Sequence, residues 1–141
     1  MAFLSRQLYI RTSCIPRSGK GLFTEKNIRK GARIIEYKGR MSTWKEVDHG
    51  YWTNGYIFYI DRSHVVDAST YKKAFGRYAN DARGISRIKG LNNNAEYVAE
   101  DFKVYIDAVR NIPAGSEILV EYGKEYWQVI RHNAEIISDD E

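Results

Sequence analysis

Short apolar stretches recur along the chain, and turns rich in glycine separate them. The stretches 33–39, 56–60 and 102–109 combine β-branched and aromatic residues with polar ones, a composition typical of strands. Shorter strands are predicted at 6–12, 22–24 and 65–67, and after the turn that contains Pro113 and Gly115. Many short strands between glycine turns predict a mainly β domain rather than a βαβ fold.

Helical spacing is restricted to three segments. Ser42 is a candidate cap for a helical turn through 43–46, because a glutamate follows at capping distance. The segment 71–78 is predicted to form a short helix. In 124–134, aromatic and apolar residues recur at helical spacing, which predicts the only sizeable helix of the chain.

Length and composition indicate one folded domain. The chain has 141 residues, 43% of them hydrophobic, and 11 tyrosines, which is enough apolar material for a core. We expect a single domain over 1–134, followed by an acidic, flexible tail over 135–141. No apolar run has the length of a membrane-spanning helix, and 1–13 lacks the continuous apolar region of a signal peptide.

Cysteine and histidine usage argues against a metal centre. Cys14 is the only cysteine, so a disulfide or a thiolate zinc cluster within one chain is excluded. The three histidines (His49, His64 and His132) lack metal-ligand spacing. A reducing compartment, the nucleus or the cytoplasm, is therefore expected.

The formal net charge is +4 at pH 7. A solvated basic surface accounts for such a modest excess, and contact with nucleic acid is the alternative interpretation. Both interpretations stay open on charge alone.

Four motifs stand out along the chain. Gly19-Lys-Gly21-Leu-Phe on its own predicts a hairpin turn, because the third glycine and long helix of a dinucleotide fingerprint are missing. Ile35-Glu-Tyr-Lys-Gly39 ends a predicted strand, and Gly76-Arg-Tyr-Ala-Asn-Asp81 lies in the middle of the chain. Ile112-Pro-Ala-Gly-Ser-Glu117 precedes Val120-Glu-Tyr-Gly123, where a strand ends in aromatic residues.

In this order the motifs resemble those of the SET-domain protein lysine methyltransferases, over roughly Gly19 to Trp127. Asn80 stands at the asparagine of the family's Arg-Phe-x-Asn-His motif, and Asn94 is the best match to the second asparagine of the pattern. The resemblance implies a β-clip-like fold of several small sheets, with a knot-like core and a short C-terminal helix. Because the cysteines of the zinc tail of many relatives are missing, a small SET domain without that tail is expected.

The resemblance also implies a chemistry and a set of site residues. S-adenosylmethionine would be the methyl donor and S-adenosylhomocysteine the product, no metal would take part, and Tyr122 would be the catalytic tyrosine. Cofactor contacts fall on Lys20, Gly21, Leu22, Arg77, Asn80, Asp81, Tyr122 and Trp127. The walls of the channel for the target lysine fall on Tyr37, Tyr59, Val120 and Tyr126.

Three departures from the family pattern bear on these expectations. Asp81 replaces the usual histidine, and 83–91 is inserted between the two asparagines. Val120 is smaller than the aromatic residue often found there, which predicts that methylation goes beyond one methyl group. Acidic residues are expected to attract a basic substrate tail, and the candidates are Glu36, Glu46, Asp48, Asp61, Glu117 and Glu121.

The expected partner is a histone tail or a nucleosome, which implies a nuclear protein. DNA contact through the basic surface and a homodimer through the C-terminal helix are further expectations. Two other functions remain open: a SET-like module that binds S-adenosylmethionine or peptide without turnover, and a small basic β domain that binds nucleic acid.

Overall fold

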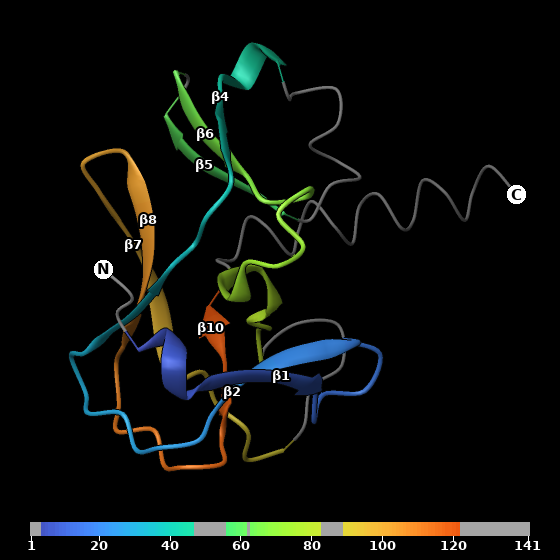
Figure 1. Ribbon diagram of the computed structural model, residues 1–141, viewed down its shortest axis with the longest axis vertical. Helices are drawn as coiled ribbons and strands as arrows, with labels where there is room; N and C mark the ends of the chain where they lie inside the picture. The colour runs from blue at the N-terminus through green and yellow to red at the C-terminus, as the bar shows by residue number, and fades with distance from the viewer. Residues whose placement is uncertain (1–3, 47–55, 62, 83–88, 122–141) are drawn as a thin grey trace, which may run out of the picture.

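The computed structural model describes residues 4–46, 56–61, 63–82 and 89–121 of the chain. Within these ranges strands dominate and form three small sheets (Figure 1). Two short 3-10 helices accompany them, η1 (Ser5–Gln7) and η2 (Phe75–Tyr78), and residues 44–46 after β4 are helical. The predicted mainly β architecture of several small sheets is confirmed.

The first sheet places β2 (Lys20–Thr24) between two neighbours. β1 (Leu8–Thr12) pairs with β2 antiparallel, and the short β9 (Glu117–Ile118) pairs with the other edge of β2. As the central strand, β2 is buried from Gly21 onward, and only Lys20 is exposed. The glycine turn therefore opens at the exposed, N-terminal end of a buried strand.

The second sheet has four strands in the order β10 (Val120–Glu121), β7 (Ala95–Glu100), β8 (Lys103–Ala108) and β3 (Arg33–Glu36). β7 and β8 form a hairpin whose turn residues, Asp101 and Phe102, have φ values of 52° and 62°. Such left-handed values are what a two-residue hairpin turn of this hand requires. β10 runs parallel to β7. Because only Leu119 separates β9 from β10, the chain enters this sheet directly after leaving the first one.

The third sheet contains β4 (Arg40–Ser42), β6 (His64–Asp67) and β5 (Ile57–Asp61), in that order and all antiparallel. In Figure 1 it lies at the top of the molecule, the β1–β2 pair lies at the bottom, and η2 lies between them. η2 thus lies between the sheet that carries the glycine turn and the sheet that contains the β5–β6 hairpin.

Apolar side chains from all three sheets form the core. The main cluster joins the first two sheets through Leu22, Ile34, Ile106 and Val120, each fully buried. A side chain of this kind stabilises the fold by about 1.5–3 kcal/mol when it is fully buried. A second cluster joins the second and third sheets, with members Tyr37, Val66, Ala68 and Val104.

Several sequence-based expectations need correction. The helix predicted over 71–78 is reduced to the single 3-10 turn of η2. One cause is that Gly76 packs against the main chain of β3, where a Cβ would come within 2.9 Å of the Glu36 oxygen. The helical turn predicted through 43–46 is confirmed at residues 44–46, but Ser42 belongs to strand β4, and Thr43 Oγ1 accepts the Glu46 amide in its place. Strand β7 was not predicted, and the expected helix 124–134 and tail 135–141 lie outside the described residues.

Candidate active site

The short segment that contains β9 and β10 draws the sequence motifs together. Ile118 pairs with Leu22 of β2 on one side. On another side Leu119 forms a parallel bridge with Asn80, and the amide of Val120 donates to the Asn80 carbonyl at 2.8 Å. The glycine turn, the 76–82 segment and the 117–121 segment therefore meet, as the resemblance requires. A knot-like threading also involves the chain beyond Glu121, so it stays a prediction.

Gly19 and Gly21 shape the glycine turn for different physical reasons. Gly19 has a φ of 66°, a left-handed value that favours glycine, and its carbonyl accepts the Ser13 amide at 2.8 Å. No atom lies within 4 Å of a Cβ built on Gly19. A Cβ on Gly21 would instead come within 2.3 Å of Glu117 Oε2. Gly19 therefore permits the turn, whereas Gly21 makes room for a buried carboxylate beneath it.

Asn80 joins the middle of the chain to the glycine turn. Its Nδ2 donates to the Lys20 carbonyl at 3.0 Å and to Glu117 Oε2 at 3.3 Å. Within the described part of the chain, its Oδ1 has no hydrogen-bond partner. The predicted cofactor residues Lys20, Gly21 and Asn80 are thus brought together, with an acceptor oxygen left for a ligand.

Glu117 is the residue at this site that sequence reasoning misplaced. We expected it in a groove that attracts a basic tail, but only 6% of it is exposed, so it cannot line such a groove. Its carboxylate accepts hydrogen bonds from the Ser13 hydroxyl at 2.7 Å and from the Cys14 amide at 2.9 Å. The available signal was the apolar run directly after it, Ile118-Leu119-Val120, because an acid that is buried together with such a run needs hydrogen-bond donors.

Cys14 shares the same carboxylate. Its thiol donates to Glu117 Oε1 at 2.9 Å. Desolvation by burial is the largest influence on this thiol, and together with Glu117 it raises the thiol pKa to about 11. Because the thiolate is the reactive form, this arrangement makes Cys14 a donor that helps to hold Glu117 rather than a nucleophile.

Asp81 and Asn93 form a second polar contact next to Asn80. Asp81 is buried, and its Oδ1 accepts from Asn93 Nδ2 at 2.9 Å, while Asn93 Oδ1 accepts the Ala82 amide at 2.8 Å. Asn93 is therefore more than a polar turn residue, because it ties the 80–82 segment to the start of β7. The role of Asp81 as a cofactor contact stays a prediction.

Asn94 supports the segment that carries Glu117. Its Nδ2 donates to the Glu117 carbonyl at 2.9 Å, and its Oδ1 accepts the Leu119 amide at 2.9 Å. One side chain thus replaces a strand partner for this stretch of backbone. Asn94 is the asparagine matched to the second asparagine of the family motif, and this location gives it a structural duty beside Asn80.

Arg77 points away from the glycine turn. Its Nη1 donates to the carbonyls of Ala68 at 3.1 Å and Ser69 at 2.9 Å, and its guanidinium lies 4.1 Å from the ring centroid of Tyr56. The side chain therefore fastens η2 to the segment after β6. It does not join the group formed by Lys20, Gly21 and Asn80. Leu22 also points into the main core, so only its main chain could contact a cofactor.

The described residues predicted for the lysine channel do not converge. Tyr37 is buried, its hydroxyl donates to the Tyr56 carbonyl at 2.8 Å, and its ring contacts Phe58 and Tyr97. Tyr59 is 48% exposed and packs edge-on against Trp44. Successive residues of a strand face opposite sides, so Phe58, rather than Tyr59, shares the side of β5 that faces Tyr37. The role of Tyr59 as a channel wall stays a prediction.

Val120 is also placed differently from the expectation. Its side chain is fully buried in the main cluster, and the room that its small size would leave for a methylated amine stays a prediction. Three further predicted residues lie outside the described ranges, namely Tyr122, Tyr126 and Trp127. Their roles stay predictions.

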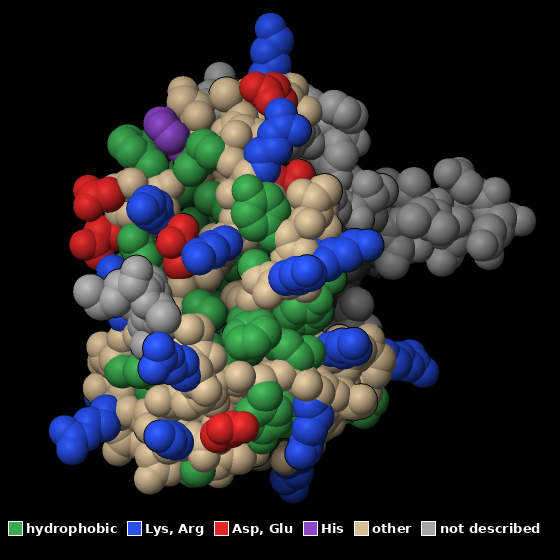
Figure 2. Space-filling model, viewed as in Figure 1, with side chains coloured by type: hydrophobic (Ala, Val, Ile, Leu, Met, Phe, Trp, Pro, Cys, Tyr) green, Lys and Arg blue, Asp and Glu red, His purple; other side chains and the backbone are tan. Residues whose placement is uncertain are grey.

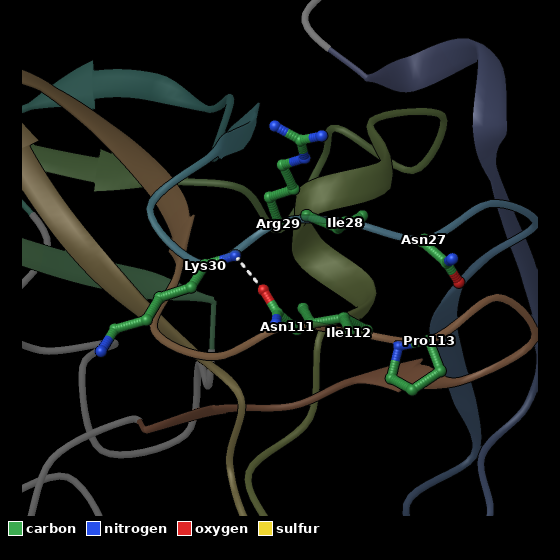
Figure 3. Close-up of a pocket in the computed structure, with 7 residues that line it drawn as sticks. All are labelled: Asn27, Ile28, Arg29, Lys30, Asn111, Ile112 and Pro113. Atoms are coloured by element: carbon green, nitrogen blue, oxygen red, sulfur yellow. Dashed lines mark hydrogen bonds between the residues drawn. The ribbon is translucent and has the colours of Figure 1, made fainter.

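A separate hollow lies at the far end of β2 from the glycine turn (Figure 3). Its volume is about 610 Å³, and residues 27–30 and 111–113 line it. Asn111 Oδ1 accepts the Lys30 amide across it at 2.9 Å, and Ile28 and Ile112 pair through their main chains. None of the predicted site residues lines this hollow, so its size does not make it the active site.

Two negative findings concern the described residues only. No cluster of three or more His, Cys, Asp or Glu side chains that could hold a metal ion occurs there. Likewise, no helix in that part of the chain is long and apolar enough to cross a membrane.

Comparison with known proteins identifies the family. A sequence profile of the SET domain matches residues 19–123. This is most of the chain, so the protein belongs to the SET domain family, a family of protein lysine methyltransferases. The resemblance of the four motifs is thereby confirmed.

A solved structure supports the same fold. The chain is similar to the methyltransferase domain of human PR domain-containing protein 2, with a TM-score of 0.62 and 22% sequence identity. The match covers 83% of this chain and 77% of that one. The expected SET fold is confirmed for the described residues.

Curated relatives are similar at the level of sequence. The chain is 27% identical over 124 residues to the inactive histone-lysine N-methyltransferase 2E of Homo sapiens, and equally to that of Mus musculus. The match covers 81% of this chain, whereas the chain spans only 6% of the length of these relatives. The name of both relatives describes them as inactive.

The residues at the glycine turn fit the cofactor that the family uses. S-adenosylmethionine carries an amine, which can donate a hydrogen bond to Asn80 Oδ1. The open space beside Gly19 permits close approach to the main chain. Exposed Lys20 lies at the same edge, where its positive charge would favour a ligand carboxylate.

Proposed function

We propose that this protein transfers methyl groups from S-adenosylmethionine to lysine side chains of a protein, with a histone tail as the substrate. Family membership supports the class of reaction. The observation that carries the proposal within the molecule is the hydrogen bond of 3.0 Å between Asn80 Nδ2 and the Lys20 carbonyl. It joins two motifs that are 60 residues apart in the sequence at the edge where a cofactor would bind.

The protein's own contribution to such a reaction is positioning. S-adenosylmethionine supplies an activated methyl group when it is bound. The glycine turn and Asn80 would hold the cofactor, and the Tyr122 hydroxyl would orient the reacting methyl group. The target lysine must lose its proton first, and a narrow apolar channel favours the neutral amine.

The proposed partners are inferred from charge and from the relatives. The net charge of +4 suits contact with nucleosomal DNA, although Lys and Arg side chains are spread over the face in Figure 2 rather than gathered in one patch. The relatives named as histone-lysine methyltransferases support a nuclear location. A homodimer through the C-terminal helix completes the proposal.

A second candidate function is binding without turnover. The curated relatives are named inactive, and Asp81 stands where the family has histidine. Its carboxylate accepts from Asn93 and cannot donate as a histidine would. The protein would then bind S-adenosylmethionine or a peptide without transferring a methyl group.

One experiment separates these functions. The protein is incubated with methyl-labelled S-adenosylmethionine and core histones or nucleosomes, beside Tyr122→Phe and Asn80→Ala. Label on one histone that both substitutions abolish supports the enzyme. A thermal shift with S-adenosylhomocysteine but no label on any histone supports the binding module or a non-histone substrate. Neither label nor shift, with nucleic-acid affinity that falls steeply with salt, supports the nucleic-acid-binding domain.

A further inference from the structure

The carboxylate of Glu117 receives hydrogen bonds from four groups, and every one of them is a donor. Oε2 accepts from the Ser13 hydroxyl and Asn80 Nδ2, while Oε1 accepts from the amide and the thiol of Cys14. We refer to Ser13, Cys14, Asn80 and Glu117 as the Glu117 cluster. A carboxylate has about four lone-pair sites, so this cluster satisfies it without a cation from the described residues.

The Glu117 cluster connects segments that are distant in sequence. Glu117 lies 104 residues from Ser13 and 37 residues from Asn80. It reaches both because Gly21 has no side chain, since a Cβ there would come within 2.3 Å of Oε2. The Ser13 hydroxyl also accepts the Ile15 amide at 3.1 Å, which extends the ordering into the loop before the glycine turn.

Two acceptors determine which way the Asn80 amide points. The Lys20 carbonyl and Glu117 Oε2 both lie at hydrogen-bonding distance from its nitrogen. An amide oxygen turned toward these two oxygens would be repelled, so the nitrogen must face them and Oδ1 must face away. The Lys20 carbonyl and the carboxylate at position 117 therefore together direct the acceptor that Asn80 offers to a ligand.

We propose that Glu117 is a positioning residue of the cofactor site, and that it sets cofactor affinity by holding Asn80 Oδ1 toward the ligand amine. The inference rests on the proposed function, because it assumes that S-adenosylmethionine binds at the glycine turn. Glu117 itself is buried beneath Gly21 and does not touch the ligand. Its action passes through Asn80 on one side and through the loop of Ser13 and Cys14 on the other.

Glu117→Gln is the sharpest substitution, because it keeps the size of the side chain and changes one acceptor into a donor. The new NH2 group must face either the Asn80 and Ser13 donors or the Cys14 donors, and donor against donor is unfavourable. We expect the affinity for S-adenosylhomocysteine to fall about tenfold, the size expected when one charge-assisted hydrogen bond is lost. Isothermal titration calorimetry measures this, and Ser116→Ala, one residue away in the same turn, is the matched control.

A double-mutant cycle shows whether Glu117 acts through Asn80. In the Asn80→Ala background, Glu117→Gln should weaken binding far less than it does in the wild type. Losses that simply multiply would overturn the proposal, because they would mean that Glu117 does not act through Asn80. Unchanged affinity in a folded Glu117→Gln protein would overturn it as well.

A second measurement needs no ligand and keeps the two proposals distinguishable. In the NMR spectrum of the free protein, the side-chain NH2 protons of Asn80 should exchange slowly with solvent in the wild type and faster in Glu117→Gln. Equal exchange rates would contradict the positioning role whether or not the cofactor binds. A wild type that shows slow exchange but fails to bind S-adenosylhomocysteine would instead contradict the proposed function, and the role of Glu117 in cofactor affinity would fall with it.

Discussion

The first and third sheets carry the two halves of the expected site, and they are stabilised in opposite ways. Around β2 and β9 a buried carboxylate, Glu117, is surrounded by hydrogen-bond donors from distant segments. Beside the third sheet, Phe58 of β5 packs with Tyr37 and Tyr97 from the second sheet and the segment after it, while Tyr59 stays 48% exposed. The cofactor side is therefore ordered by directional polar contacts, and the opposite side by aromatic packing.

This difference determines how each region responds to change. A buried polar network is worth most when every member is satisfied, and losing one partner leaves a buried group unpaired. Aromatic packing is less directional, so an exposed ring can change with little cost. We expect the effects of substitutions near Glu117 on stability to be coupled, and the effects of substitutions around Tyr59 to be additive.

The largest effect is expected at Gly39, directly before β4 of the third sheet. A Cβ there would come within 2.6 Å of the Asp67 oxygen and 2.7 Å of its carbonyl carbon, and main-chain atoms cannot move aside as a side chain can. Gly39→Ala should lower the free energy of unfolding by about 3 kcal/mol, the upper end of the usual overpacking cost. Urea denaturation measures it.

Gly31→Ala is the matched control for this substitution. Gly31 has a φ of 90° and no atom within 4 Å of a built Cβ, so only the backbone conformation is strained, at a cost of about 1–2 kcal/mol. Equal losses for the two variants would show that steric contact at Gly39 is not the cause.

Gly21→Ala is expected to come next. Its Cβ would meet Glu117 Oε2 at 2.3 Å and Ser13 Cβ at 3.2 Å. The Glu117 side chain can move, but only by giving up hydrogen bonds, so we expect a loss of about 2 kcal/mol. In Glu117→Ala the same substitution should cost much less, since the carboxylate is gone. Additive costs in urea denaturation of the double variant would mean that the two residues do not compete for this space.

Removing the Tyr37 hydroxyl should have a smaller effect. Its hydrogen bond to the Tyr56 carbonyl is 2.8 Å long, and loss of such a bond typically costs about 1 kcal/mol. Tyr37→Phe should therefore shift the urea midpoint measurably. Tyr59→Phe removes a hydroxyl from an exposed ring and should leave the midpoint unchanged. A shift in Tyr59→Phe of the same size would contradict the contrast between the two tyrosines.

The smallest expected effect is on the rate at which the Cys14 thiol is alkylated. Because the pKa of Cys14 is raised to about 11, little thiolate forms at neutral pH and alkylation by iodoacetamide should be slow. Glu117→Gln removes the negative charge and should lower this pKa, so alkylation at pH 8 should become faster. Cys14 is the only cysteine, and mass spectrometry therefore reports its rate directly.

The raised pKa of Cys14 also determines how the stability of the fold depends on pH. The ordinary value is 9.0 and the folded value is higher, so the folded state keeps its proton while the unfolded chain loses it. This contribution to stability is fully present below pH 9 and is lost as the pH rises toward about 11. A stability that increased over this range in the wild type, but not in Cys14→Ser, would contradict the assignment.

Much of the fold was predictable because local patterns and tertiary structure agree. The β-branched run of β3 and the glycine turn before β2 are both local signals. Strand β7 was missed because its alternation, Glu96-Tyr97-Val98, comes directly after a polar asparagine run. Its strand conformation depends on the pairing with β8, which no local signal reports.

The site was predictable in part for a similar reason. Motif order was enough to bring Asn80 to the glycine turn. The contacts of the predicted channel residues required knowledge of which side each residue of a strand faces, because Phe58 rather than Tyr59 packs against Tyr37. Glu117 was assigned to a surface groove because acids are usually exposed, whereas its donors come from segments 37 to 104 residues away.

The most direct test of the central claim maps where the cofactor binds. Titrating ¹⁵N-labelled protein with S-adenosylhomocysteine should shift the amide signals of Gly19, Lys20 and Gly21 and both signals of the Asn80 side chain. The signals of the hollow at 27–30 and 111–113 should stay in place. Shifts confined to that hollow, or no shifts at saturating ligand, would contradict the claim that the glycine turn and Asn80 form the cofactor site.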